Sequence, residues 1–284
     1  MNGVRIASLM LLLMALVNVP AFAQVDFSGE WFSIPYEDLQ DRRAGPEVGD
    51  FTGLPINDAD RLRADTHDSS YFALPEWQCR PHGVDWITFG MSDMRIDKVT
   101  DPVTGRLKAW RMHWLRSAFD RDIWMDGRSH PSEYAPHTWE GFSTGKWDGD
   151  TLVISVTHVT EDYLRRNGLQ RSERSTMTQY LFMDDDFLTW TTVLYDPVYL
   201  TEPLIRNASY RRVPHQQLPA YPCPTVVEEV RPKGQIPHYL PGANPYIDEF
   251  ATKRNLPFEA TRGGAETMYP EYQDKLKQMS KAPK

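Results

Sequence analysis

The sequence predicts a mainly β protein: an antiparallel up-and-down, lipocalin-like barrel of about 8–10 strands, followed by a proline-rich C-terminal strap that carries short helices. Apolar and polar residues alternate with a period of two through residues 84–213, which is typical of strands with one buried face. Turn residues separate these runs, and no long amphipathic helix interrupts them. Because consecutive antiparallel strands must lose their exposed edges, we expect closure into a barrel rather than stacking as a sandwich.

Residues 1–23 have the pattern of a secretory signal peptide. Arg5 supplies a positive start, residues 6–19 form an apolar run, and Ala21-Phe22-Ala23 is a small-x-small cleavage pattern. The apolar run is shorter than the roughly 20 residues that span a bilayer. We therefore expect cleavage near Ala23, a periplasmic or secreted product, and no stable membrane insertion.

Residues 24–83 form an extended N-terminal segment that is rich in turn residues, with one strand near Trp31 and a helical pattern over residues 58–66. Residues 84–213 supply the barrel core, with hairpin turns at residues 101–105, 147–150 and 184–186. The expected strands of this core cover residues 84–89, 94–99, 107–115, 122–125, 139–146, 151–159, 176–183, 187–195 and 204–212.

Residues 214–284 form the strap, which we expect to cross the barrel. Short helices are expected over residues 245–254 and 271–279, with Asn244 as the cap of the first and Pro245 in its first turn. In an oxidising compartment, Cys79 and Cys223 are expected to form a disulfide that fixes the strap to the core. Two free buried thiols are the alternative, because unpaired cysteine packs as a small hydrophobic residue.

The composition limits the partners. The net charge of −8 at pH 7 argues against nucleic acid, because the chain has no excess of basic residues to follow phosphates. Aromatic residues make up 12% of the chain and include 9 tryptophans, which favours a wide apolar cavity or a surface that stacks on rings. No histidine pair has i, i+4 spacing and no Cys-x-x-Cys occurs, so we predict neither a metal site nor a cofactor.

Two groups of residues are candidates for catalysis. His158 continues a strand face of alternating apolar residues, and it lies at one end of the cavity as a base if that face looks inward. A core histidine bonded to a carbonyl is the alternative. Asp126, Arg128 and His130 cluster around a turn, which suits acid/base or anion-binding chemistry. A tight turn with a solvated Arg128 is the alternative for this cluster.

The strand over residues 107–115 has one face with a cation and an imidazole and another with large aromatic residues. One of these faces must look inward, so either the polar pair or the aromatic pair contributes to a ligand site. Polar residues after His158 and an imidazole beside Cys79 are further candidates. The candidate ligand-binding residues are Arg111, His113, Trp110, Trp114, Tyr163 and His82.

Residues 141–145 spell G-x-S-x-G. A turn and a strand follow Ser143, whereas the nucleophile of an α/β-hydrolase needs the start of a helix at this point. The sequence therefore does not favour a serine hydrolase.

Several motifs resemble known families. Gly29-Glu30-Trp31 resembles the G-x-W of lipocalin-like barrels, in which the Trp closes one end of the barrel. The D-G-R-x-H-P pattern at residues 126–131, the G-x-S-x-G-x-W-x-G-D-T-L pattern at residues 141–152 and Asp196-Pro197 resemble a widespread family of exported bacterial proteins with no established activity. The tail, at residues 237–242 and 261–264, resembles one branch of that family. The resemblance implies export and a β architecture, and it gives no residue a role.

Two functions follow from these patterns. The first is an exported, small-molecule-binding barrel for an aromatic or lipophilic ligand, with acid/base catalysis of lyase, isomerase, hydratase or hydrolase type by His158 or His130, assisted by Arg128. The alternative is a carbohydrate- or envelope-binding module with an exposed tryptophan platform. The platform residues would be Trp110, Trp114, Trp139 and Trp190.

Overall fold

The structure is a computed structural model that describes residues 24–34, 47–68, 80–89, 93–114, 120–218, 232–236 and 238–279. The expected signal peptide, Cys79 and Cys223 lie outside these residues. Cleavage near Ala23 and the disulfide therefore stay predictions.

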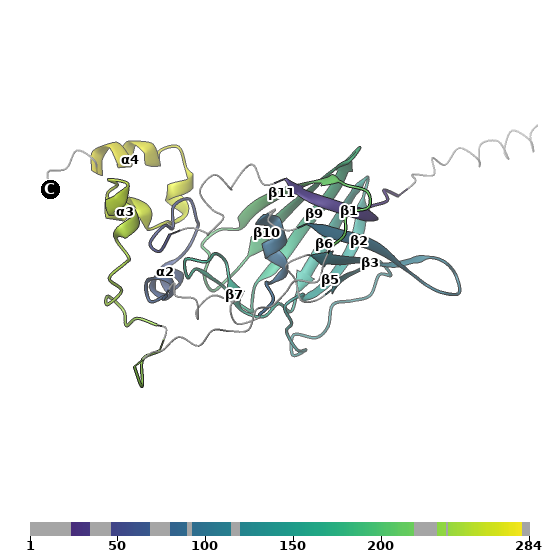
Figure 1. The fold of residues 1–284 in the computed structure, drawn as a ribbon, viewed down its shortest axis with the longest axis horizontal. Helices are drawn as coiled ribbons and strands as arrows, with labels where there is room; N and C mark the ends of the chain where they lie inside the picture. The colour runs from purple at the N-terminus through teal and green to yellow at the C-terminus, as the bar shows by residue number, and fades with distance from the viewer. Residues whose placement is uncertain are drawn as a thin grey trace, which may run out of the picture.

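Nine strands form a closed barrel in the order β1-β11-β10-β9-β6-β5-β4-β3-β2 (Figure 1). The predicted fold class is confirmed. Two further short strands pair with each other outside the barrel, β7 (Asp162–Tyr163) and β8 (Gln170–Arg171). The barrel strands are β1 (Gly29–Ile34), β2 (Met94–Thr100), β3 (Leu107–Trp114), β4 (Asp120–Trp124), β5 (Phe142–Asp148), β6 (Thr151–Thr157), β9 (Thr176–Asp184), β10 (Phe187–Tyr195) and β11 (Leu204–Arg212).

One pair of neighbouring strands departs from the up-and-down pattern. β4 and β5 run parallel, with Ile123 opposite Ser143, whereas the other barrel pairs are antiparallel. A parallel pair needs a connection that returns to the starting end of the first strand. Residues 125–141 provide this connection, and the motif around Asp126 and His130 lies within it.

Alternate residues of each strand point into the barrel, as a period of two requires. On β6, the side chains of Leu152, Ile154 and Val156 are fully buried. Trp110 and Trp190 belong to the same hydrophobic core, at 1% and 0% exposure. Burial of large aromatic side chains inside the barrel is a major source of its stability.

The N-terminal segment closes one end of the barrel. The indole N–H of Trp31 donates to the carbonyl oxygen of Phe27 at 3.0 Å, and the guanidinium carbon of Arg212 lies 4.5 Å from the centre of the Trp31 ring. Phe27 stacks on Trp147 with ring centroids 5.5 Å apart. The segment before β1 thus packs against Trp31 and Trp147, and we call this end of the barrel the closed end.

The expected strand over residues 84–89 is wrong, because Val84–Phe89 forms a 3-10 helix, η3. The Asp162 carboxylate accepts the N–H of Gly83 at 2.8 Å, and the indole N–H of Trp86 donates to the carbonyl oxygen of Tyr163 at 2.8 Å. These contacts with β7 outweigh the apolar, β-branched character of the segment. η3 contacts β10 and β11 and thereby lies between the barrel wall and β7.

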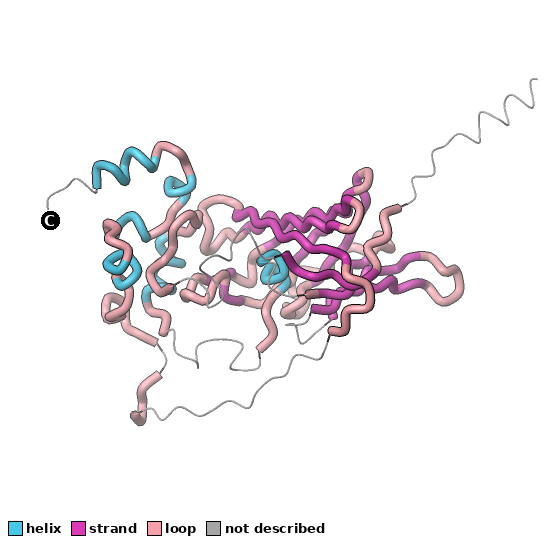
Figure 2. Tube along the Cα trace, turned by 45° about the horizontal axis from the view of Figure 1, so that its top comes forward, coloured by secondary structure: helices cyan, strands magenta, loops and turns pink. Residues whose placement is uncertain are grey.

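The helix expected over residues 58–66 is present as α2 (Asp58–Asp65). The Asn57 side chain accepts the N–H groups of Ala59 and Asp60 and caps its start. Figure 2 shows α2 gathered with the helices of the strap on one side of the barrel. The strap contains α3 (Glu249–Lys253), η4 (Phe258–Thr261), η5 (Ala265–Met268) and α4 (Tyr272–Met279).

The first strap helix is shorter than the expected residues 245–254, because residues 245–248 form turns and α3 begins after Asp248. The Asn244 side-chain oxygen accepts the N–H of Tyr246 at 3.0 Å and so caps these turns. Its side-chain amide donates to the carbonyl oxygens of Asp65 at 2.9 Å and His67 at 3.2 Å. These bonds fix the strap to the end of α2. Within the described residues, no helix is both long and apolar enough to span a bilayer.

Candidate functional site

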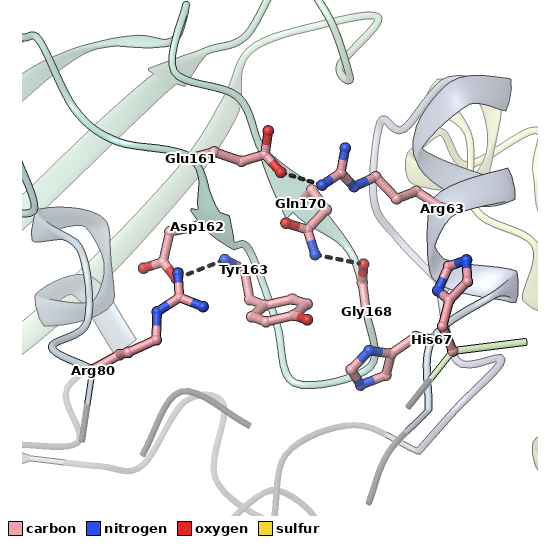
Figure 3. A pocket seen from close by; sticks show the side chains of 9 residues that line it. Arg63, His67, Arg80, Glu161, Asp162, Tyr163, Gly168 and Gln170 are labelled. Atoms are coloured by element: carbon pink, nitrogen blue, oxygen red, sulfur yellow. Dashed lines mark hydrogen bonds and ion pairs between the residues drawn. The ribbon is translucent and has the colours of Figure 1, made fainter. Parts of the chain in front are cut away.

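A pocket of about 410 Å³ lies where α2, β7, β8 and the strap meet (Figure 3). Most of the side chains that line it are polar or titratable, so we call it the polar pocket. The described lining residues are Arg63, His67, Arg80, Glu161, Asp162, Tyr163, Gly168, Gln170 and His238.

The β7–β8 pair holds one wall of the polar pocket. Tyr163 lies opposite Gln170, and the turn between the two strands contains Gly168 with φ +95°. A side chain at Gly168 would place its Cβ 2.4 Å from the Cβ of His67, so glycine is required both for the backbone angle and for the close approach. The turn therefore brings His67 against the pocket wall.

Asp162 lies on β7 at the edge of the pocket, and its carboxyl group is buried on the face of β7 opposite the Tyr163 ring, near Gly83 and Arg171. Its Oδ2 accepts the N–H of Gly83 at 2.8 Å and its Oδ1 accepts the N–H of Tyr163 at 2.7 Å. Burial, and then the charge of Asp85, raise the pKa of Asp162 to about 6, while Arg171 opposes the shift. Asp162 can therefore exchange a proton near neutral pH.

His67 is a neutral imidazole in the same pocket. Burial lowers its pKa to about 4, although Asp68 and a hydrogen bond with the backbone of Arg166 oppose the shift. Its ring lies edge-on to Tyr163 with centroids 5.4 Å apart. The Nε2 atom is buried and has no hydrogen-bond partner among the described residues.

Tyr163 and two arginines complete the chemistry of the pocket. Burial raises the pKa of the Tyr163 phenol, which forms a hydrogen bond with the Gln170 side chain. Arg63 pairs with Glu161. The charges of Arg80 and Arg63 act in the opposite direction on the phenol, so both cations favour a negatively charged group of a ligand at this position, while burial keeps the phenol itself protonated.

Asp60 lies behind the pocket, and sequence reasoning missed it. It is fully buried on α2, and its Oδ1 accepts the backbone N–H of Gln170 at 2.9 Å. Burial raises the pKa of Asp60 to about 8, and the charge of Asp196 adds to the shift. The one signal in the sequence is that Asp60 and Ala64 share a helix face, and Ala64 is also buried.

The predicted ligand-binding residues do not lie together in the structure. Tyr163 lines the polar pocket. His82 stacks on Trp86, with ring centroids 3.9 Å apart, and its charge acts on Asp162. His82 is thus close to the pocket, but it is not one of the described lining residues.

The two faces of β3 are now distinguished. Trp110 and Trp114 point into the barrel, and the polar pair lies on the outer wall. Arg111 forms two hydrogen bonds of 2.7 Å with Asp122 on β4, and His113 lies 2.7 Å from Asp120. Arg111 and His113 therefore form cross-strand pairs outside the barrel, where neither can reach an internal ligand.

The predicted catalytic histidines lie outside the barrel. His158 has φ 58° and follows the last residue of β6, so the chain turns before the apolar face reaches it. Its Nδ1 and the Nδ1 of His130 both lie 2.7 Å from the hydroxyl of Thr157. The ring of His137 lies 5.3 Å from that of His158. These histidines fix residues 130–138 against the outer wall, and neither predicted histidine lines the polar pocket.

Asp126 and Arg128 pair with each other. Their closest contact is 2.6 Å, and the Arg128 guanidinium lies 3.5 Å from the centre of the Trp124 ring. This pairing lowers the pKa of Asp126 to about 2. The geometry matches the alternative of a tight turn, and the pair does not line the pocket.

The tryptophans of the expected platform do not form an exposed surface, and the G-x-S-x-G segment does not form a strand-to-helix turn. Trp110, Trp114 and Trp190 are buried, which removes three of the four platform residues. The fourth, Trp139, is half-buried, with the Arg80 guanidinium 5.0 Å from its ring centre. Ser143 is buried inside the barrel and accepts a hydrogen bond from Arg121.

Among the described residues, no group of three or more His, Cys, Asp or Glu side chains is arranged to hold a metal ion. Comparison of the chain with protein-family models gave no match, and a search of curated proteins also gave none.

Proposed function

We propose that this protein is an exported, small-molecule-binding barrel whose ligand occupies the polar pocket and undergoes acid/base chemistry there. The observation that carries the proposal is the combination of a neutral imidazole and a phenol in one cavity, with a carboxyl group of pKa about 6 on the other face of the strand that carries the phenol. Burial shifts the pKa of Asp162 upward and that of His67 downward. Opposed shifts of this kind are typical of sites that supply both a proton donor and a proton acceptor.

The lining of the pocket defines the ligand class. The rings of Tyr163 and His67 offer faces for an aromatic group, and Arg63 and Arg80 favour a polar or negatively charged substituent. An aromatic ligand with polar groups fits this lining better than a purely lipophilic one. In this proposal, Asp162, His67 and Tyr163 have the catalytic roles that were expected from the sequence for His158, His130 and Arg128.

Native mass spectrometry tests the proposal without knowledge of the ligand. The full chain is purified without refolding from a bacterial periplasm and compared before and after denaturation. We expect an additional small-molecule mass that denaturation removes. Tyr163→Phe should retain about tenfold less of it, because the phenol lies in the pocket, whereas Tyr195→Phe, on the exposed outer wall of β10, should retain as much as the wild type.

The acid/base part has a separate test. If Asp162 exchanges a proton with the ligand, retention should change between pH 5 and pH 7 in the wild type and stay constant in Asp162→Asn. A bare protein mass, or equal retention by Tyr163→Phe and the wild type, would contradict the placement of the ligand. Retention that does not vary with pH would contradict the chemistry.

A further inference from the structure

The barrel contains a buried arginine near the end opposite Trp31. Arg121 is 1% exposed and points inward from β4. Its Nε donates to the Ser143 hydroxyl at 3.0 Å, and its Nη2 donates to the Gln179 side-chain carbonyl at 2.7 Å. Gln179 in turn donates to the Thr192 hydroxyl at 3.0 Å. These four side chains form a polar belt, each at most 2% exposed, within an apolar interior.

The positive charge of Arg121 has no acidic counterpart among the described residues. Both of its acceptors are neutral groups, a hydroxyl and an amide. Burial alone accounts for the lowering of its pKa to about 9, and no carboxylate contributes. Because an isolated buried charge is strongly unfavourable, this arrangement requires a negative charge from elsewhere.

Three hydrogen-bond donors at this place also have no acceptor. Arg121 Nη1, Trp114 Nε1 and Trp190 Nε1 are buried without a partner among the described residues. The Arg121 guanidinium carbon lies 5.7 Å from the Trp190 ring centre, and the Trp114 and Trp190 centroids are 6.4 Å apart. A cation and unused N–H groups thus lie together, which is the composition of an anion site.

We propose that Arg121, Trp114 and Trp190 bind a small monovalent anion, either free chloride or the carboxylate group of an organic molecule. The anion accepts hydrogen bonds from the guanidinium and indole N–H groups and neutralises the enclosed charge. None of these residues lines the polar pocket, so this site is independent of the proposed function.

Thermal unfolding of the full chain tests the anion site. Protein dialysed into a low-salt HEPES buffer without halide or carboxylate is titrated with sodium chloride, sodium formate or sodium benzoate, with sodium sulfate at matched ionic strength and neutral benzamide as controls. The wild type should melt at a rising temperature as a binding anion is added, because a ligand of the folded state stabilises it. A response to chloride identifies the free ion, and a response to formate or benzoate, but not benzamide, identifies a carboxylate.

Variants assign the effect to the interior. Arg121→Gln should lose the anion response, and Arg111→Gln, which removes the same charge from the outer wall of the neighbouring strand, should keep it. Trp190→Phe keeps the ring and removes one donor, so its apparent Kd should rise about tenfold, and it tests the proposal if Arg121→Gln does not fold. A wild type that responds to none of the three anions would overturn the proposal, as would an unchanged response in both interior variants.

Discussion

The two ends of the barrel differ in the hydrogen-bond partners and the charge of their buried polar groups. At the closed end, the Trp31 indole donates to the Phe27 carbonyl oxygen and Arg212 covers its ring. The indole N–H of Trp147 at the same end is buried without a partner among the described residues, but it is neutral. At the opposite end, the charged Arg121 and the Trp190 indole have donors without acceptors among the described residues. Native proteins pair nearly all buried polar groups, so the exceptions mark places where stability is given up for binding. The closed end is therefore structural, and the opposite end, with the segments beyond it, is where we expect function.

The segments around the polar pocket also differ from the closed end in their buried polar groups. Asp60 and His67 are buried titratable groups with their pKa values shifted by desolvation. Such groups lower the stability of the folded protein at the pH where the unfolded chain would ionise them. Substitutions at the closed end should therefore destabilise the protein, whereas some substitutions near the pocket should stabilise it.

The largest expected effect is at the closed end. Trp31→Ala removes a fully buried indole and its hydrogen bond to Phe27, and it should lower the free energy of unfolding by about 3–5 kcal/mol. Urea denaturation followed by circular dichroism measures this. Phe187→Ala, at a ring that is 52% exposed on β10, is the control and should change stability by about 0.5 kcal/mol or less. A cost below about 1 kcal/mol for Trp31→Ala would mean that this residue does not close the barrel.

Asp60→Asn, near the pocket, should raise the free energy of unfolding, whereas Trp31→Ala lowers it. The folded-state pKa of about 8 means that folding favours protonated Asp60, so its contribution is complete below pH 3.8 and is lost as the pH rises toward 8. Asparagine keeps an oxygen to accept the N–H of Gln170 and cannot ionise. The variant should gain about 2–4 kcal/mol over the wild type at pH 7–8.

The measurement is the free energy of unfolding of both proteins at pH 4, 6 and 8. The two curves should meet near pH 4 and separate as the pH rises. Parallel curves, or a variant that is less stable at pH 8, would show that Asp60 is ionised in the folded protein.

His67→Asn tests the second shifted group, with the pH dependence reversed. The folded-state pKa of about 4 means that the stability due to neutral His67 is complete above pH 6.5 and is lost as the pH falls toward 4. The side-chain amide of asparagine can take over the hydrogen bond with the backbone of Arg166. Relative to the wild type, the variant should therefore gain about 1–3 kcal/mol between pH 6.5 and pH 4, measured by urea denaturation. A constant difference between the two proteins across this range would contradict a buried, neutral His67.

The sequence predicted the barrel well because each strand carries its own signal. In β10, alternate buried and exposed residues over Phe187–Tyr195 match the expected bounds, since one face of each strand must be apolar. The strand prediction for residues 84–89 was wrong because their conformation depends on contacts with Asp162 and Tyr163, far along the chain. A local pattern contains no information about such partners.

The candidate site was predicted less well for the same reason. His158 lay on the expected apolar face, and its positive φ, which moves it outside, has no signature in the strand pattern. Asp162 and His67 gain their pKa shifts from burial by segments that only the fold brings together. Arg121 was missed because a single cation in a short strand resembles an outward-facing residue.

The smallest expected effect belongs to the outer wall, which differs from both ends in being solvated. Arg111 and Asp122 pair across β3 and β4 at 2.7 Å, with side-chain exposures of 44% and 19%. Because water and salt screen such a pair, a double-mutant cycle with Arg111→Ala and Asp122→Ala should give a coupling energy of about 0.2–1 kcal/mol. The coupling should fall further in 1 M salt. A coupling above about 2 kcal/mol would mean that charges on the wall stabilise the barrel as much as its closed end does, and the contrast between wall and ends would fail.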